Sequence, residues 1–296
     1  MNPVNFGERY SSPVTLCMGH YESLHKGHTE IIKTAAQIAE RNGSEVMLMT
    51  FDERLNPRFG RVILTYPERL ERAASLGVKA VLRIDFNEEF ADTPAENFLV
   101  SVSEKLNLKC IVCGYDFRYG KGRAGDANSL EAFCKTAGIE FRAVEKVALN
   151  GEKISSSAVK KALSAGDVSG ANSMLGYRYF IRGNVEEGRQ DGRKMGFPTA
   201  NVVWPSNKFE VKKGVYATRS VIDGEEFLGI TNFGAAPTFG SGRVLTETHY
   251  VNLKKDLYGR EVTLQFDAFL RDIRRFSTVT ELKEQLENDL KKVLRI

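Results

Sequence analysis

The sequence predicts an α/β protein in two parts: a layered domain with a parallel sheet, then a small antiparallel β-barrel with a C-terminal helix. Strand-like and helix-like stretches alternate from residue 14 to about residue 163. Beyond residue 179, short alternating runs and turn residues replace the helices, until residues 279–293 return to a helical pattern. A chain of 296 residues also exceeds what one compact core usually serves.

Apolar runs typical of buried strands alternate with amphipathic helical stretches in the first part. The strands are expected at Val14–Met18, Glu45–Phe51, Ala80–Ile84, Cys110–Cys113 and Glu140–Val144. The helices are expected near Thr29–Asn42, Pro67–Leu76, Ala95–Leu106 and Asp126–Ala137. This alternation predicts a parallel sheet covered on both faces, with ligands bound at the carboxyl ends of its strands.

Turn signals separate the short alternating runs of the second part. They lie at Asn184, Asp191-Gly192, Asp223-Gly224, Ser241-Gly242 and Tyr258-Gly259, a pattern that predicts a small antiparallel sheet or barrel. The last helix should carry one apolar stripe and begin at a capping box formed by Thr278 and Glu281. The stripe consists of Val279, Leu282, Leu286, Leu290 and Val293.

Composition argues against several classes of protein. The net charge of +4, from 42 basic and 38 acidic residues, is too balanced to indicate a nucleic-acid partner. No apolar run approaches the roughly 18 residues of a membrane span, and the N-terminus lacks a signal peptide's apolar core, so we expect no membrane association and a cytoplasmic location. Cys110 and Cys113 belong to a strand and not to a helix start, which favours reduced, structural thiols. The sequence does not indicate an oligomeric state.

Three of the four histidines lie where the first strand feeds the first helix. Gly19 and His20 follow the strand, and His25 and His28 flank Lys26-Gly27 at the expected helix start. Free backbone N–H groups and the helix dipole favour anions there, so this is a place to hold a triphosphate. Two other interpretations remain open: the pair only caps the helix, or His20, His25 and His28 bind a metal.

The run His25-Lys26-Gly27-His28 resembles the H-x-G-H signature of nucleotidyltransferases that move a nucleoside monophosphate from ATP onto a phosphate or acid. Gly19 to Leu24 is similar to the G-N-F-D-G-V that precedes this signature in bacterial FAD synthetases. The glycine-rich, basic and aromatic segment 114–126 resembles their G-x-D-F-x-F-G-x-x-x-x-G-D. On this resemblance Asp116 and Arg118 are candidate site residues in a Rossmann-like nucleotidyltransferase domain.

A further anion cradle is expected where Ser155, Ser156 and Ser157 precede a helix that carries Lys160. The family's counterpart reads I-S-S-T-R-I-R, so Ala158 stands in place of its first arginine. Two other segments depart from the family pattern: Tyr21-Glu22-Ser23 replaces F-D-G, and residues 51–55 lack the usual F-D-P-H-P. A weakened first domain is therefore one expectation.

The pattern from Gly183 to Asn201 resembles the riboflavin kinase motif that ends in G-F-P-T-A-N. Its spaced glycines, among them Gly188, Gly192 and Gly196, can bring backbone N–H groups to a polyphosphate. Thr199 and Asn201 offer neutral oxygens of the kind that suit Mg²⁺ carrying a nucleotide. The resemblance continues to the end of the chain and implies Glu247 as the general base, a binding role for Arg271, and a supporting role for His249.

The resemblance as a whole is to bacterial bifunctional riboflavin kinases and FMN adenylyltransferases. It implies domains at 1–178 and 179–296 that act on riboflavin, FMN and ATP, with Mg²⁺ as cofactor and FMN and FAD as products. His25 and His28 would stabilise charge on the phosphates during adenylyl transfer. Two alternatives remain: a kinase whose first domain no longer transfers adenylate, and a sensor of flavin nucleotides that regulates a partner or an RNA.

Overall fold

The computed structural model describes residues 3–55, 60–149, 151–188, 196–235 and 244–296. Internal contacts divide the chain into two compact units, residues 1–156 and 157–296. This division counts the two helices that follow residue 156 with the second unit. The domain limits of 1–178 and 179–296 stay a prediction.

The first unit contains a six-stranded parallel sheet in the order β1-β4-β3-β2-β5-β8. Its strands are β1 (Pro3–Asn5), β2 (Tyr10–Met18), β3 (Glu45–Phe51), β4 (Ala80–Ile84), β5 (Leu106–Gly114) and β8 (Glu140–Val144). The five predicted strands are confirmed. The edge strand β1 was not predicted, because three half-buried residues are too short to show a hydrophobic period.

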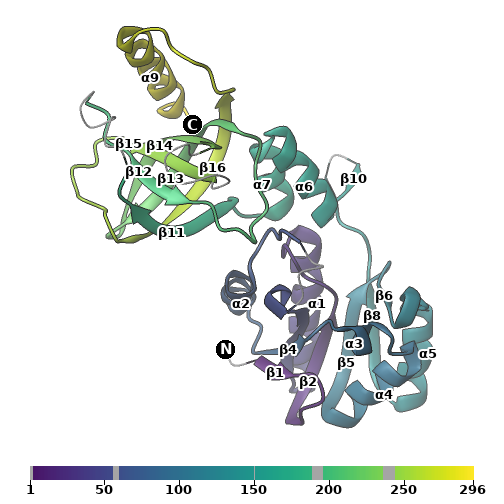
Figure 1. Ribbon diagram of the computed structural model, residues 1–296. Helices are drawn as coiled ribbons and strands as arrows, with labels where there is room; N and C mark the ends of the chain where they lie inside the picture. Colours follow the sequence, from purple (N-terminus) through teal and green to yellow (C-terminus); the bar gives the residue numbers. More distant parts are fainter. Residues whose placement is uncertain (1–2, 56–59, 150, 189–195, 236–243) are drawn as a thin grey trace. The chain divides into compact units, whose positions relative to one another are not determined.

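The first unit also contains five α-helices within its described residues (Figure 1). They are α1 (Lys26–Asn42), α2 (Tyr66–Ser75), α3 (Glu88–Ala91), α4 (Ala95–Lys105) and α5 (Ala127–Ala137), with short 3₁₀ turns at Glu53–Leu55 and Lys121–Arg123. Gly43 and Gly138 end α1 and α5 in the left-handed conformation, with φ of 66° and 68°. Two small hairpins, β6 (Arg118–Tyr119) with β7 (Gly125–Asp126) and β9 (Ala148–Leu149) with β10 (Glu152–Lys153), were not predicted.

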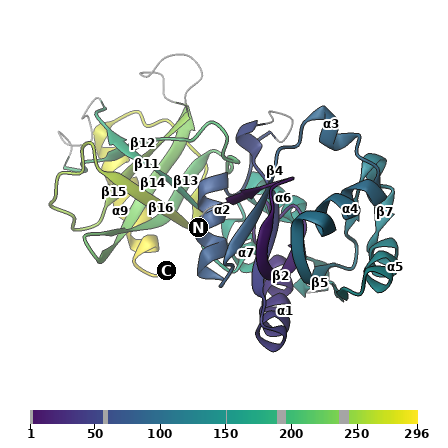
Figure 2. The ribbon, with the colours of Figure 1, turned by 90° about the horizontal axis from the view of Figure 1, so that it is seen from below.

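The second unit is a closed antiparallel barrel preceded by α6 (Ser156–Ala165) and α7 (Val168–Leu175). Its strands run in the order β11-β12-β15-β14-β13-β16 around the barrel, which Figures 1 and 2 show from two directions. Their bounds are β11 (Phe180–Glu186), β12 (Ala200–Val203), β13 (Gly214–Ile222), β14 (Glu225–Ala235), β15 (Val244–Tyr250) and β16 (Glu261–Arg271). The predicted fold class is confirmed in both units.

Of the five predicted turns, two are confirmed, one is wrong and two lie outside the described residues. Asp223-Gly224 joins β13 to β14, and Tyr258-Gly259 lies between β15 and β16, as expected. The turn predicted at Asn184 is wrong, because this residue lies inside β11 and pairs with Glu261 of β16. The turns predicted at 191–192 and 241–242 lie outside the described residues.

Helix α9 (Val279–Val293) covers the barrel at β13 and β14. Val293 is buried there beside Val215, Ala217 and Ile230. Thr278 caps the helix by accepting the backbone N–H of Glu281, as predicted. The predicted stripe is wrong at its start, since Val279 is 55% exposed.

Threonine hydroxyls form a polar layer in the barrel interior. Thr218, Thr231 and Thr248 are all buried, and their hydroxyls hydrogen-bond in sequence at 2.7 and 2.8 Å. Each hydroxyl therefore has a partner inside the barrel, which offsets the cost of its burial.

Two further expectations concern the whole chain. All four cysteines are free and buried, which confirms the predicted structural thiols. Within the described ranges, no helix has the length and apolar character that a membrane crossing needs.

Candidate active sites

An aromatic cavity of about 590 Å³ opens at the carboxyl edge of the parallel sheet. Gly19 and His20 follow β2, Phe51 ends β3, Phe86 follows β4, and residues 116–123 follow β5. These are the positions where open parallel sheets bind ligands, since the strand order switches at β2: β3 and β4 follow on one side of it, and β5 and β8 lie on the other. Sequence reasoning placed a site at this edge but did not find the phenylalanine-lined cavity.

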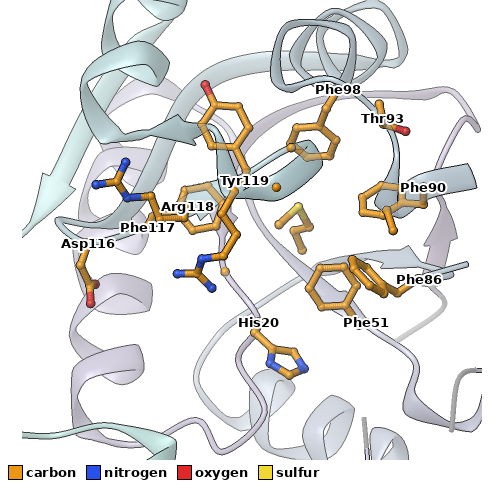
Figure 3. Close-up of a pocket in the computed structure, with 16 residues that line it drawn as sticks. His20, Phe51, Phe86, Phe90, Thr93, Phe98, Asp116, Phe117, Arg118 and Tyr119 are labelled. Atoms are coloured by element: carbon orange, nitrogen blue, oxygen red, sulfur yellow. The ribbon is translucent and has the colours of Figure 1, made fainter. Parts of the chain in front are cut away.

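Asp116 and Arg118 line this cavity, as predicted. Figure 3 shows them on one side of the space, with the rings of Phe51, Phe86 and Phe90 on the other. Arg118 also forms an ion pair with Asp126 at 3.1 Å across the β6–β7 hairpin. The cavity therefore has an aromatic wall and a charged wall, which suits a planar aromatic ligand that carries a phosphate.

His25 and His28 meet at the start of α1. Their rings stack at a centroid distance of 3.7 Å, and His25 Nδ1 accepts the backbone N–H of His28 at 3.2 Å. His25 is thus the N-cap of α1, so the capping interpretation describes a real contact. Capping does not use the ring's other nitrogen, which can still contact a ligand.

Burial keeps both imidazoles neutral. It lowers the pKa of His25 to about 4 and that of His28 well below its usual value, where the neighbouring His25 contributes further. Because Nδ1 of neutral His25 accepts a hydrogen bond, its proton lies on Nε2. His25 therefore presents an N–H donor, the group that an anionic phosphate oxygen needs.

The loop between β2 and α1 is held in an unusual backbone conformation. Tyr21 and Leu24 are fully buried and have φ values of 53° and 43°. The Tyr21 ring packs edge-on against His28 at 4.9 Å and lies where a side chain on Gly19 would stand, 2.8 Å from an added Cβ. Gly19 therefore permits the ring position that supports His28.

Two residues that depart from the family pattern form specific contacts in this loop. Glu22 accepts the backbone N–H of Ile63 at 3.2 Å, and Ser23 and Ser156 share a hydrogen bond of 2.9 Å between their hydroxyls. Glu22 and Ser23, although they differ from the family pattern, thus each make a hydrogen bond that holds the loop.

The buried Arg69 of α2 is a residue that sequence reasoning missed. Only 1% exposed, it donates from Nη1 to Thr50 Oγ1 at 2.9 Å and from Nη2 to Glu53 Oε2 at 3.1 Å. Thr50 in turn donates to the carbonyl of His20 at 2.8 Å. This network joins the loops that follow β2 and β3, although no local pattern in the sequence indicates it.

The serine segment is divided between the units. Ser155 and Ser156 end the first unit, whereas Ser157 and Lys160 belong to the second, where Lys160 Nζ lies 5.5 Å from the ring centroid of Phe209. The shared phosphate cradle of the serines, Lys160 and the histidines stays a prediction. The metal site of three histidines is not supported, because the described residues contain no group of three His, Cys, Asp or Glu that could hold an ion.

Three polar side chains align across neighbouring strands of the barrel. Asn201 of β12 and Asn232 of β14 are both cross-strand partners of Glu247 of β15. Direct partners point to the same face of a sheet. Glu247 is exposed and accepts a hydrogen bond from Asn232 Nδ2 at 3.2 Å, whereas its neighbours Thr246 and Thr248 are buried. The predicted base thus faces outward beside Asn201.

The side-chain oxygen of Asn201 is buried and available to a ligand. It is 6% exposed, and its Oδ1 has no hydrogen-bond partner in the part of the chain that the structure describes. A Cβ on Gly188 would lie 2.1 Å from Asn201 Nδ2, so only glycine allows this approach. Gly196 has a φ of 87°, whereas Gly192 lies outside the described residues.

Thr199 lines a second cavity, of about 280 Å³, together with Thr248, Tyr250, Lys254 and Leu257. His249 supports this end of the barrel, since its Nδ1 lies 3.0 Å from the carbonyl oxygen of Pro198.

Arg271 is bound to helix α9. Its Nε donates to the buried carboxylate of Asp289 at 2.9 Å. The predicted binding role of Arg271 stays a prediction.

The fold and the two sites define a two-part protein, with an H-x-G-H nucleotidyltransferase-like domain and a barrel that resembles riboflavin kinases. A family model described as FAD synthetase matches residues 8–158, and one described as riboflavin kinase matches residues 175–296. The chain belongs to the family of bifunctional riboflavin kinases/FMN adenylyltransferases.

Relatives match over nearly the full chain. The bifunctional riboflavin kinase/FMN adenylyltransferase of Bacillus subtilis is 34% identical over 95% of this chain and 91% of its own. That of Escherichia coli K12 is 32% identical over 96% of this chain and 93% of its own. A solved structure described as a macrolide-efflux protein from Streptococcus pneumoniae is 26% identical, with a TM-score of 0.90 and 99% of each chain covered.

Proposed function

We propose that this protein is an enzyme of flavin cofactor synthesis that uses ATP twice. The barrel phosphorylates riboflavin to FMN, and the parallel-sheet domain transfers adenylate to FMN to give FAD. The observation that carries the proposal is that each unit of one chain matches one of the two family models. The stacked histidine pair and the paired Asn201 and Glu247 support it. We place both reactions in the cytoplasm, where ATP is available.

In the kinase reaction, Glu247 acts as the general base. Its carboxylate, held by Asn232 Nδ2 at 3.2 Å, accepts the proton of the riboflavin 5′-hydroxyl as that oxygen attacks the γ-phosphate of ATP. The cavity beside Thr199 is the place we assign to ATP. Because phosphoryl transfer depends mostly on positioning, the backbone near Gly188 and Gly196 contributes by admitting the phosphates.

In the adenylyl transfer, no protein nucleophile is needed. The FMN phosphate attacks the α-phosphate of ATP, a new P–O bond forms, and pyrophosphate leaves. His25 donates from Nε2, and the first-turn N–H groups of α1 stabilise the growing negative charge. The aromatic cavity accepts the flavin ring against Phe51, Phe86 and Phe90.

Mg²⁺ suits the kinase site by the chemistry of its donors. The unpartnered Oδ1 of Asn201 and the hydroxyl of Thr199 are hard oxygen ligands, and Mg²⁺ commonly takes few protein ligands and completes its shell with phosphates and water. Thr199 and Asn201 would hold the ion, which supplies neutralisation of phosphate charge. This assignment is part of the proposal.

Two incubations test the proposal. With riboflavin, ATP and Mg²⁺ the protein should form FMN and then FAD; with FMN, ATP and Mg²⁺ it should form FAD and one pyrophosphate per FAD. Absence of FAD and pyrophosphate from the second incubation would leave riboflavin kinase alone. Absence of both products from both incubations, with flavin nucleotides still bound, would favour the sensor alternative.

A further inference from the structure

Lys153 of the β9–β10 hairpin is a charged residue that the mechanism above does not use. Its ammonium group forms an ion pair with the carboxylate of Asp116, and Nζ lies 5.3 Å from the ring centroid of Tyr115. The side chains of Lys153 and Asp116 are 44% and 50% exposed, so solvent and ligands reach both. No local sequence pattern indicates a role for Lys153, because its partner Asp116 lies 37 residues earlier in the chain.

The hairpin brings Lys153 to the anion site at the start of α1. Val147, whose carbonyl accepts the backbone N–H of Ile154 at 3.1 Å, has its Cβ 3.9 Å from the position of a Cβ on Gly27. Gly27 lies in the first turn of α1, between the two stacked histidines. The charges of Lys153 and Asp116 also act on His25, where Lys153 lowers the pKa and Asp116 raises it.

The ion pair between Lys153 and Asp116 changes the charge beside the anion site. A lone carboxylate beside His25 would repel a polyphosphate, and Lys153 neutralises it. An ammonium group has three N–H donors, and the ion pair with Asp116 uses one of them. The remaining donors point to a ligand role, since the ion pair fixes the flexible lysine side chain before the ligand arrives.

We propose that Lys153 binds a phosphate oxygen of ATP in the adenylyl transfer, with Asp116 as the residue that positions it. The inference rests on the proposed function of the first domain and adds a binding residue to it. Lys153 acts on the polyphosphate of ATP, whereas the flavin ring contacts the aromatic wall of the cavity.

Lys153→Met tests the assignment in the full-length protein. We expect the KM for ATP in FAD formation from FMN to rise about tenfold to a hundredfold, the loss typical of one charge-assisted hydrogen bond. Lys153→Arg should restore most of the affinity. Lys146→Met, which removes an exposed lysine from the segment before the hairpin, should leave the KM unchanged. An unchanged kcat for FAD formation at saturating ATP shows that the first unit stays folded in each variant.

The double variant Asp116→Asn/Lys153→Met separates phosphate binding from mere neutralisation of Asp116. If Lys153 binds phosphate, the KM for ATP stays raised in the double variant. The inference would be overturned if the double variant had the wild-type KM, or if Lys153→Met alone left the KM unchanged. The proposed function would still hold as long as the wild-type protein forms FAD. A wild-type protein that forms no FAD would remove the proposed function and this inference together.

Discussion

Glu247 owes its proposed role to its neighbours, because a strand glutamate is otherwise an ordinary solvated charge. The side chain faces outward on β15 between Asn201 and Asn232, its partners on the two adjacent strands. The Asn232 amide fixes one carboxylate oxygen at 3.2 Å and leaves the other for a substrate hydroxyl. This arrangement predicts a base that can be removed without disturbing the barrel.

Glu247→Gln should lower the kcat of riboflavin phosphorylation by about a hundredfold or more, the contribution typical of general base catalysis. The KM for riboflavin should change by less than about threefold, since glutamine keeps the shape and can still accept from Asn232. Steady-state assays at saturating ATP measure both constants. Glu225→Gln, at an exposed position at the start of β14, is the matched control. Near-full turnover in Glu247→Gln would contradict the assignment.

The residues of both sites differ in how visible they are in the sequence. His25, His28, Thr199 and Asn201 lie in compact motifs whose chemistry can be recognised locally. Lys153 and Arg69 cannot be found in this way, because their partners are distant along the chain and meet them only in the folded protein. The phenylalanine cavity has the same origin, since Phe51 ends β3, Phe86 and Phe90 follow β4, and Phe117 follows β5.

At the scale of secondary structure, the ion pair between the partly buried Arg271 and the buried Asp289 connects β16 to α9. Asp289 is fully buried and also accepts from Gln285 Nε2 at 2.8 Å. Removal of one partner of such a pair leaves the other charge uncompensated. The last helix is thus fixed by a charged contact as well as by Val293 and its apolar neighbours.

Asp289→Ala should lower the free energy of unfolding of the barrel by about 3 kcal/mol. The only tryptophan, Trp204, packs 4.3 Å from Phe233 inside the barrel, so its fluorescence during urea denaturation reports this unit. Glu284→Ala, on the exposed side of α9, controls for helix propensity. Equal midpoints for Asp289→Ala and the control would show that the pair contributes little.

Elements with a clear period were predictable, and those without one were not. Strands β3, β4 and β8 and helix α9 have the predicted bounds, because their apolar residues repeat at the spacing of a buried strand or an amphipathic helix. The two-residue strands β6, β7, β9 and β10 are too short to show any period. The sequence predicted a turn at Asn184 because asparagine is common in turns. In the structure, its pairing with Glu261 of β16 keeps it inside β11.

For the whole molecule, the residues that we propose as catalytic for the two reactions lie in different units. The histidine pair lies in the first unit, and Asn201 and Glu247 lie in the second. The two reactions should therefore be separable by mutation, with FMN as the compound they share.

Glu247→Gln and His28→Asn, each alone, should fail to convert riboflavin to FAD at an appreciable rate. A mixture of the two variants should restore FAD after a lag, since FMN made by one can be used by the other. Chromatography of the flavins over time follows this. If each variant keeps its single reaction but the mixture forms no FAD, FMN does not pass through solution between chains.

The alternation along β15 has a consequence for the history of this barrel. Thr246, Glu247 and Thr248 face in, out and in, so the insertion or loss of one residue within the strand would exchange an interior hydroxyl for the carboxylate of Glu247. A change of one residue in strand length then needs a β-bulge to restore the alternation, and parity becomes a property on which selection acts. Among natural variants of this chain, odd-numbered gaps in β15 should be rare outside turns and bulges.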